Sequence, residues 1–174
     1  MLPPFTGEKM SDDIKKQVLR FLDDAKIAYE LFEHEPSFTI EQCAEIEKIT
    51  NAPICKNLLL CPSNKSEYVL LAMQGEKPFV TKEISKRLGK SRLSFADGEM
   101  MMQLLKTAPG SLSITGLIFD KSHRVQLAVD SDLLDNEYFC CHPCDNTATL
   151  KIKTADIFEK FLPLLGVTPI ITEV

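Results

Sequence analysis

The chain lacks the long apolar run that a membrane span requires. A transmembrane helix needs about 20 predominantly apolar residues, and no such run occurs in the 174 residues. The first residues, MLPPFTGEKMSDD, also lack the basic segment and apolar stretch that open a secretory signal. We therefore expect a cytoplasmic protein with no membrane partner, in which the six cysteines are free thiols.

Broad positive charge is also missing. Lys and Arg number 20 against 25 Asp and Glu, which gives a formal net charge of −5. Dedicated nucleic-acid binders are usually basic over a whole domain or face. The composition therefore argues against a DNA-binding protein, although it leaves room for a local basic patch.

No low-complexity linker, internal repeat or shift in composition divides the chain. We expect one domain over residues 1–174, with an N-terminal helix at about 11–27 leading into it. Ser11 is expected to cap a helix over residues 12–26. Thr39, with Gln42 three residues later, has the pattern of a capping box for a second helix that runs through Glu47.

The rest of the chain mixes short β-rich runs with helical segments. Asp97 and Thr154 are expected to cap helices, and Gly89 is expected to end one. Without a strict βαβ alternation, the order predicts an α/β fold with a mixed, largely antiparallel sheet or barrel flanked by helices. The predicted helices cover residues 81–89, 98–106, 133–138 and 155–165, and the predicted strands cover 28–32, 57–61, 68–73, 91–96, 112–120, 124–130, 138–142 and 148–153.

The segment FCCHPC, at residues 139–144, concentrates three cysteines and a histidine. A structural zinc site needs two ligand pairs, of which Cys141 and Cys144 could form one. Cys55 and Cys61 are spaced too widely for the second, and we expect them on opposite faces of a strand. A redox pair would need a helix to follow, whereas a strand is predicted. We therefore expect no metal or other cofactor, and we interpret these cysteines as core or pocket wall.

Several segments, in order, resemble the YbaK/ProX superfamily of aminoacyl-tRNA editing domains. They are CKNLLL (55–60), KPFVTKEISKRLGKSRLSFAD (77–97), APGSLSITGL (108–117) and FCCHPCDNTATLKIKTADI (139–157), in which His-Pro is followed by Asn-Thr-Ala-Thr-Leu. The likeness covers roughly residues 30–165. It is greatest to the free-standing ProX branch (PrdX, ProXp-ala), prolyl-tRNA synthetase-associated domains that remove alanine from mischarged tRNA(Pro).

The resemblance implies a YbaK-like fold and a trans-editing aminoacyl-tRNA deacylase, a carboxylic ester hydrolase. Its partner would be the acceptor end of misacylated tRNA, and a prolyl-tRNA synthetase is a second candidate partner. Many members carry proline where this chain has Ile114, so the amino acid that is removed stays open. The alternatives are Cys- or Ser-charged tRNA as the substrate, or a non-catalytic module that binds tRNA or a synthetase.

The resemblance also implies site residues. Lys56 would contact the 3′-terminal nucleotide, Gly110 would let backbone N–H groups approach the substrate carbonyl, and His142 would order the water or the substrate amine. Without the resemblance, the same residues are typical of a surface lysine, a Pro-Gly turn and a structural histidine. We see no Ser-His-Asp arrangement or paired carboxylates, and the resemblance implies that a ribose hydroxyl helps to activate the water. The expected substrate-binding residues are Asn57, Ser111, Leu112, Ser113, Ile114, Asn146 and Thr147.

The one local concentration of positive charge lies between residues 82 and 92. Lys82 and Lys86 are four residues apart and so share one face of the predicted helix. Such a face is either ordinary solvated surface or a contact for the acceptor phosphates, because phosphate binding requires cations. The candidate tRNA-binding residues are Lys82, Lys86, Arg87 and Lys90.

Overall fold

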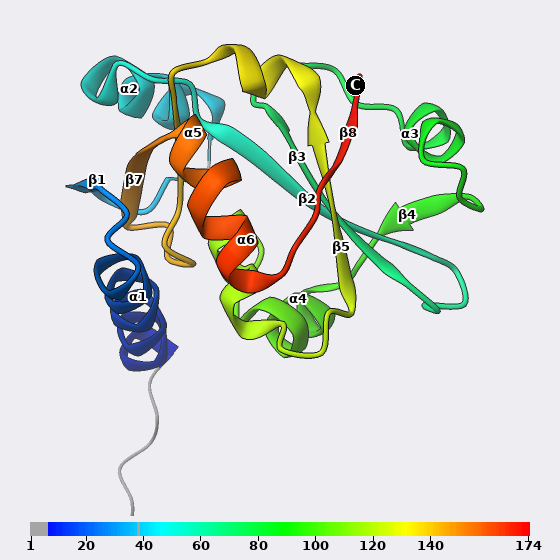
Figure 1. Ribbon diagram of the computed structural model, residues 1–174, viewed down its shortest axis with the longest axis horizontal. Coiled ribbons are helices and arrows are strands. Elements are labelled where there is room, and N and C mark those ends of the chain that lie inside the picture. The colour runs from blue at the N-terminus through cyan, green and yellow to red at the C-terminus, as the bar shows by residue number, and fades with distance from the viewer. Residues whose placement is uncertain (1–6, 38) are drawn as a thin grey trace, which may run out of the picture.

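A five-stranded mixed sheet forms the centre of the fold (Figure 1). The computed structural model describes residues 7–37 and 39–174. The second strand of the sheet pairs antiparallel with both of its neighbours, and the remaining pairs are parallel. Across the sheet the strands are β4 (Leu93–Phe95), β2 (Cys55–Pro62), β3 (Tyr68–Gln74), β5 (Val125–Asp130) and β8 (Ile170–Thr172).

A second, fully antiparallel sheet lies beside the first. Its strands, in spatial order, are β1 (Tyr29–Glu33), β7 (Ala148–Lys153) and β6 (Tyr138–Cys141). An isolated bridge between Ile54 and Cys140 connects the two sheets. Within the described residues the sheets do not close into a barrel. The predicted α/β class and mixed sheet are therefore confirmed, and the barrel alternative is not.

Helical segments cover the sheets. In Figure 1 the last helical stretch passes in front of the central sheet, with α1 and the small sheet on the same side of the molecule. The rings of Phe21 and Phe161 hold α1 against this stretch, with centroids 5.7 Å apart. Among the described helices, none is long and apolar enough to span a bilayer. The segments are α1 (Gly7–Asp24), α2 (Ile40–Thr50), α3 (Thr81–Arg87), α4 (Gly98–Leu105), the 3₁₀ turns η1 (Ile114–Phe119) and η2 (Ser131–Asp135), and the continuous α5 (Thr154–Asp156), π-helical η3 (Ile157–Phe161) and α6 (Leu162–Leu165).

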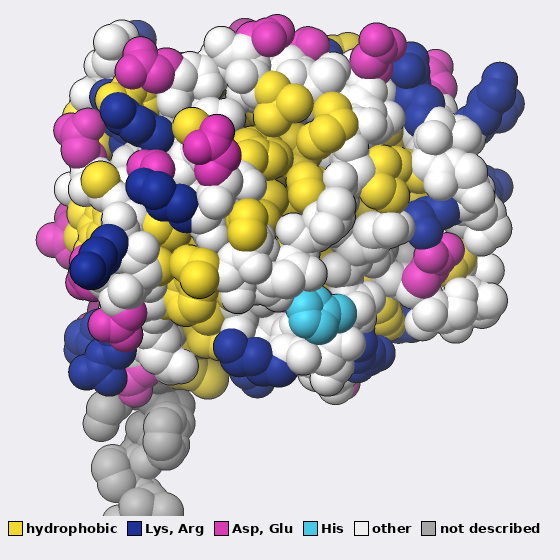
Figure 2. Space-filling view, in the orientation of Figure 1, with side chains coloured by type: hydrophobic (Ala, Val, Ile, Leu, Met, Phe, Trp, Pro, Cys, Tyr) yellow, Lys and Arg dark blue, Asp and Glu magenta, His cyan; other side chains and the backbone are white. Residues whose placement is uncertain are grey.

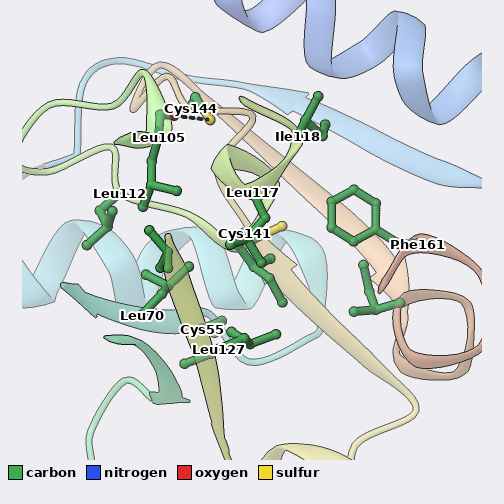
Figure 3. Close-up of a cluster of buried hydrophobic side chains, with 14 of the residues drawn as sticks. Cys55, Leu70, Leu105, Leu112, Leu117, Ile118, Leu127, Cys141, Cys144 and Phe161 are labelled. Atoms are coloured by element: carbon green, nitrogen blue, oxygen red, sulfur yellow. Dashed lines mark hydrogen bonds between the residues drawn. The ribbon is translucent and has the colours of Figure 1, made fainter. Parts of the chain in front are cut away.

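The two faces of β2 pack into different parts of the core. Cys55, Leu59 and Cys61 belong to the larger cluster, part of which Figure 3 shows, whereas Leu58 and Leu60 face a smaller one. Our expectation that Cys55 and Cys61 face opposite ways was wrong. They are six residues apart, an even number, and a regular strand returns such residues to the same face.

Local sequence signals that depend on neighbouring residues predicted the structure well. Thr39 and Gln42 form the expected capping box at α2. Asp97 accepts a hydrogen bond from the backbone of Met100 and so caps α4. Residues 57–61 and 68–73 lie in the two strands of an antiparallel hairpin, as predicted. Gly89, at a φ of 64°, follows the end of α3.

Two predicted caps were wrong because their hydroxyls bind elsewhere. Helix α1 begins before Ser11, at Gly7, and the Ser11 hydroxyl donates to Asp145 at 2.8 Å. Thr154 is the first residue of α5, and its hydroxyl donates to the carbonyl of Asn136 at 2.6 Å. In both cases a distant acceptor takes the hydroxyl that a cap would need.

The predicted strand at 112–120 is instead the 3₁₀ turn η1. Ser113 caps η1 by accepting a hydrogen bond from the backbone of Thr115. At Gly116 a side chain would approach the Leu105 carbonyl oxygen to 2.8 Å, so glycine permits close packing on α4. These contacts override the β preference of Ile114 and Thr115. Strand β8, three residues long, was not predicted.

Candidate active site

One cavity of about 690 Å³ is lined by all three of the predicted catalytic residues. Its walls are the first residues of β2, the turn after β3, one face of α2, the loop at 109–112 and the end of β6. The volume is within the range of pockets that hold small molecules. Two other grooves, of about 590 and 410 Å³, contain none of the predicted catalytic residues. The predicted residues that line the cavity are Lys56, Asn57, Gly110, Leu112 and His142.

Lys56 lies at the start of β2, opposite Met73 of β3. Its side chain is half-buried, and among the described residues its ammonium has no ion-pair or hydrogen-bond partner. Asn57 lines the same cavity although successive strand residues normally face opposite ways. The Asn57 amide donates to the Cys55 carbonyl at 3.1 Å, so this side chain folds back toward the first residue of β2.

Gly110 occupies a tight turn at the cavity edge. The Ser111 N–H donates to the Ala108 carbonyl at 3.0 Å, with Pro109 and Gly110 between them. Gly110 has a φ of 90°, which is typical of the third position of a type II turn and favours glycine. Because the turn uses the Ser111 N–H, this group is not available to a substrate. Among the described residues, the N–H groups of Gly110 and Leu112 have no acceptor.

The His142 ring is oriented by its own strand connection. Nδ1 lies 2.8 Å from the carbonyl oxygen of Ala148, and since a carbonyl only accepts, Nδ1 carries the proton. In the neutral ring Nε2 therefore has a free lone pair. Burial lowers the pKa of His142, and the nearby His34 lowers it further, against the raising effects of the Ala148 bond and Asp145. The ring is thus neutral at pH 7 and can accept a hydrogen bond.

The loop after His142 is fixed by Asp145. One carboxylate oxygen accepts hydrogen bonds from the N–H and hydroxyl of Thr147, and the other accepts from Ser11 of α1. The Thr115 hydroxyl donates to the His142 carbonyl at 2.8 Å, which joins η1 to the same loop. The cavity histidine is therefore held by contacts from three separate segments.

The remaining predicted substrate-binding residues do not line the cavity. Ile114 is buried in the main core, and Ser111 and Ser113 are buried around the turn before η1. Thr147 bonds to Asp145, and the Asn146 carbonyl accepts from the backbone of Ser37. These residues therefore lie in the segments that adjoin the cavity wall and not in the wall itself.

Sequence reasoning missed several residues at or beside the cavity, among them Ser37, Glu47, Lys77 and His34. Ser37, Glu47 and Lys77 line it, and the His34 ring lies 6.3 Å from that of His142. The Glu47 carboxylate accepts the Ile54 N–H at 2.8 Å. Ser37, Glu47 and His34 lie outside the segments that resemble the family, and Lys77 opens one of them without any role being assigned to it.

The cysteines near His142 are buried core residues. Figure 3 shows Cys55, Cys141 and Cys144 among leucine side chains and Phe161. Burial raises the pKa values of Cys55 and Cys144 to about 12, and that of Cys141 well above its ordinary value. Such thiols stay protonated, so they are poor nucleophiles and metal ligands. Among the described residues, no group of three or more His, Cys, Asp or Glu could hold a metal ion.

Helix α3 begins four residues after Lys77, which is the last cavity residue of the turn after β3. Lys82 and Lys86 are exposed on it, and neither has an ion-pair partner among the described residues. Arg87 and Lys90, in contrast, each pair with a glutamate from another segment. On the face seen in Figure 2, Lys and Arg are interspersed with Asp and Glu. Only part of the predicted basic patch is therefore free for an anionic partner.

Comparisons with known proteins show the class to which this fold belongs. The chain matches the family described as the aminoacyl-tRNA editing domain over residues 34–160, and it belongs to that family. Its enzymatic class is that of the aminoacyl-tRNA deacylases, which act on mischarged tRNA.

Similar proteins occur in a bacterium and in animals. The chain is 31% identical, over 91% of its length and 96% of the relative's, to the prolyl-tRNA editing protein ProX of Acetoanaerobium sticklandii. It is 28% identical, over 91% of its length and 86% of the relative's, to prolyl-tRNA synthetase associated domain-containing protein 1 of Danio rerio. A solved structure of a proposed trans-editing enzyme for prolyl tRNA synthetase shares the fold, with a TM-score of 0.69 at 16% identity over 92% of this chain and 95% of that one.

Proposed function

We propose that this protein is a trans-editing deacylase that hydrolyses misacylated tRNA, with Ala-tRNA(Pro) as its substrate. The observation that carries the proposal is the single cavity lined by Lys56, Gly110 and His142, which come from three distant segments. An activated ester needs a positioned water, a donor for the developing oxyanion and a grip on the 3′ end. Each of these residues can supply one of the three.

In this proposal Lys56 holds the 3′-terminal nucleotide beside the ester. Lys56 lines the cavity, and among the described residues its ammonium has no counter-ion, so a phosphate or the developing negative charge can occupy that role. The field of an unpaired cation in a partly desolvated site is much stronger than in bulk water. Lys56 therefore stabilises the transition state more than a surface lysine could.

His142 and the turn at Gly110 complete the arrangement. Nε2 of the neutral His142 accepts a hydrogen bond from the attacking water or the substrate amine. The N–H groups of Gly110 and Leu112, which have no acceptor in the described part of the chain, are donors for the carbonyl oxygen. Water adds to the ester carbon, the bond to the ribose oxygen breaks, and the products are the free amino acid and the deacylated tRNA. The terminal ribose hydroxyl assists this step by helping to activate the water.

A useful editor must spare Pro-tRNA(Pro), and we propose that it does so by size. A hydrophobic pocket separates ligands that differ by one methylene by only about 1–3 kcal/mol, so the exclusion of proline must be largely steric. We further propose that residues 1–174 act as one domain in the cytoplasm, with α3 on the acceptor phosphates and prolyl-tRNA synthetase as a second partner.

The test is a panel of tRNA(Pro) charged with alanine, cysteine, serine or proline, hydrolysed under single-turnover conditions. We expect the alanyl ester to react fastest and the prolyl ester to remain near its spontaneous rate. Faster hydrolysis of the cysteinyl or seryl ester would reassign the substrate. Tight binding without hydrolysis of any ester would instead identify a non-catalytic binding module.

A further inference from the structure

One residue of the cavity wall has a buried hydroxyl that lacks a hydrogen-bond partner in the part of the chain that the structure describes. Ser37 precedes α2 and lines the cavity, and only 6% of the residue is exposed. Its backbone N–H donates to the carbonyl of Asn146 at 3.3 Å, which places it beside the loop that follows His142. Among the described residues its Oγ has no hydrogen-bond partner.

A hydroxyl of this kind destabilises the free protein, because it loses its bonds to water and gains none in exchange. Most buried polar side chains in folded proteins do have partners. An exception that lies in the wall of a ligand cavity is best explained by a partner on the ligand. Thr107 is the second such hydroxyl among the described residues, and it does not line the cavity.

The other groups that line the cavity indicate which part of the substrate contacts Ser37. The nucleotides of the acceptor end continue into solvent, so the aminoacyl group is the part that can enter a recess where Ser37 is buried. Apart from the ester, an alanyl group carries only one polar substituent, its α-amino group. Glu47, from the adjoining helix, lines the same cavity and supplies negative charge, and Nε2 of His142 is a further acceptor. This arrangement suits an ammonium.

Building on the proposed function, we propose that Ser37 is a specificity residue whose Oγ accepts a hydrogen bond from the α-amino group of the substrate. This bond gives the Ser37 hydroxyl the hydrogen-bond partner that it lacks among the described residues. Ser37 thereby helps to fix the orientation of the amino acid, and with it the ester carbon, relative to Lys56 and Gly110.

The test compares Ser37→Ala with the wild type on two esters of tRNA(Pro). Alanyl-tRNA(Pro) has the α-amino group, and propionyl-tRNA(Pro) lacks it but keeps the ester. A hydrogen bond to a charged group is strong enough that its loss slows the alanyl ester by roughly 10- to 100-fold. The propionyl ester should react at the same rate, within about twofold, with both proteins. The melting temperature of Ser37→Ala should be unchanged or higher, because an unsatisfied hydroxyl is removed.

Thr107→Val is the matched control, since it also deletes a buried unpartnered hydroxyl. It should match the wild type on both esters. Equal losses by Ser37→Ala on the two esters, no loss on the alanyl ester, or a large fall in melting temperature would each overturn the inference. If wild-type protein fails on Ala-tRNA(Pro), the proposed substrate is wrong, and the comparison is repeated with the hydrolysed member of the panel and its deaminated counterpart. If no member is hydrolysed, the inference falls with the proposed function.

Discussion

Lys56 and Lys77 line the same cavity, but the fold surrounds their ammonium groups differently. Lys77 lies within 2.7–2.9 Å of carboxylate oxygens from two residues, Asp130 and Asp132. These bonds raise its pKa, although partial burial by itself would lower it. Lys56 has no counter-ion among the described residues. The fold therefore pairs one of the two cations and, among the described residues, leaves the other unpaired.

The difference shows that one cavity can contain both a lysine that stabilises its wall, Lys77, and a lysine without a counter-ion among the described residues, Lys56. The Asp130 side chain is fully buried, and Lys77 supplies the counter-charge that a buried carboxylate requires. The same bonds connect the turn after β3 to the end of β5. Lys56 lies on β2, which pairs with the other edge of β3. Lys77 is thus expected to support stability, and Lys56 is expected to support chemistry.

The largest predicted effect on stability is that of Lys77→Met. Removing one partner of a buried ion pair leaves the other charge unpaired, which costs about 3–5 kcal/mol of the free energy of unfolding. Equilibrium urea unfolding measures the loss. The control is Lys48→Met, which breaks an ion pair with Glu45 in which both side chains are more than 60% exposed. That variant should change stability by no more than about 0.5 kcal/mol. Equal effects of the two substitutions would show that the Lys77 pair is not special.

A smaller effect is predicted for binding when the charges on α3 are reversed. Lys82→Glu combined with Lys86→Glu should weaken tRNA affinity and lower the slope of log affinity against log salt by about 2, one unit for each lost phosphate contact. Fluorescence anisotropy over a salt series measures both quantities. Lys16→Glu with Arg20→Glu changes the net charge equally on α1, which Figure 1 places on the other side of the molecule from α3. If both pairs behave alike, α3 has no specific contact with tRNA.

The smallest predicted effect is a lowering of the pKa of His142. Because burial lowers this pKa, the imidazole should titrate below the ordinary value of 6.5. The folded state then favours the neutral ring, so His142 contributes stability above pH 6.5 that is lost as the pH falls through its folded pKa. A two-dimensional NMR titration of the imidazole signals, assigned with His142→Asn, measures the value. Titration at or above pH 6.5 would contradict a neutral acceptor in the cavity.

Much of the fold could be predicted because its signals are local. The capping box at Thr39, the cap at Asp97 and the β2–β3 hairpin depend on residues close in sequence. Segment 112–120 was misread as a strand because its 3₁₀ turn depends on close packing of Gly116 against α4. Strand β8 was missed because it is short and pairs in parallel with a distant strand.

The site was predictable only in part, and for the same reason. Resemblance to a family pointed to Lys56, Gly110 and His142, and the structure brings all three to one cavity. Ser37 lies outside the segments that resemble the family, and the resemblance assigned no role to Lys77, the first residue of segment 77–97. The significance of both residues depends on what surrounds them. The first is defined by a missing partner and the second by a buried carboxylate, and neither can be read from neighbouring residues.

Lys56→Ala tests the central claim most directly, measured by single-turnover hydrolysis of Ala-tRNA(Pro) together with the melting temperature. Removing one well-placed electrostatic contact typically lowers the rate by about 10²–10³-fold. We predict a loss of that size with an unchanged melting temperature, because the Lys56 ammonium has no partner among residues 7–37 and 39–174. A fully active Lys56→Ala protein would show that the unpaired lysine is ordinary surface and that the chemistry lies elsewhere.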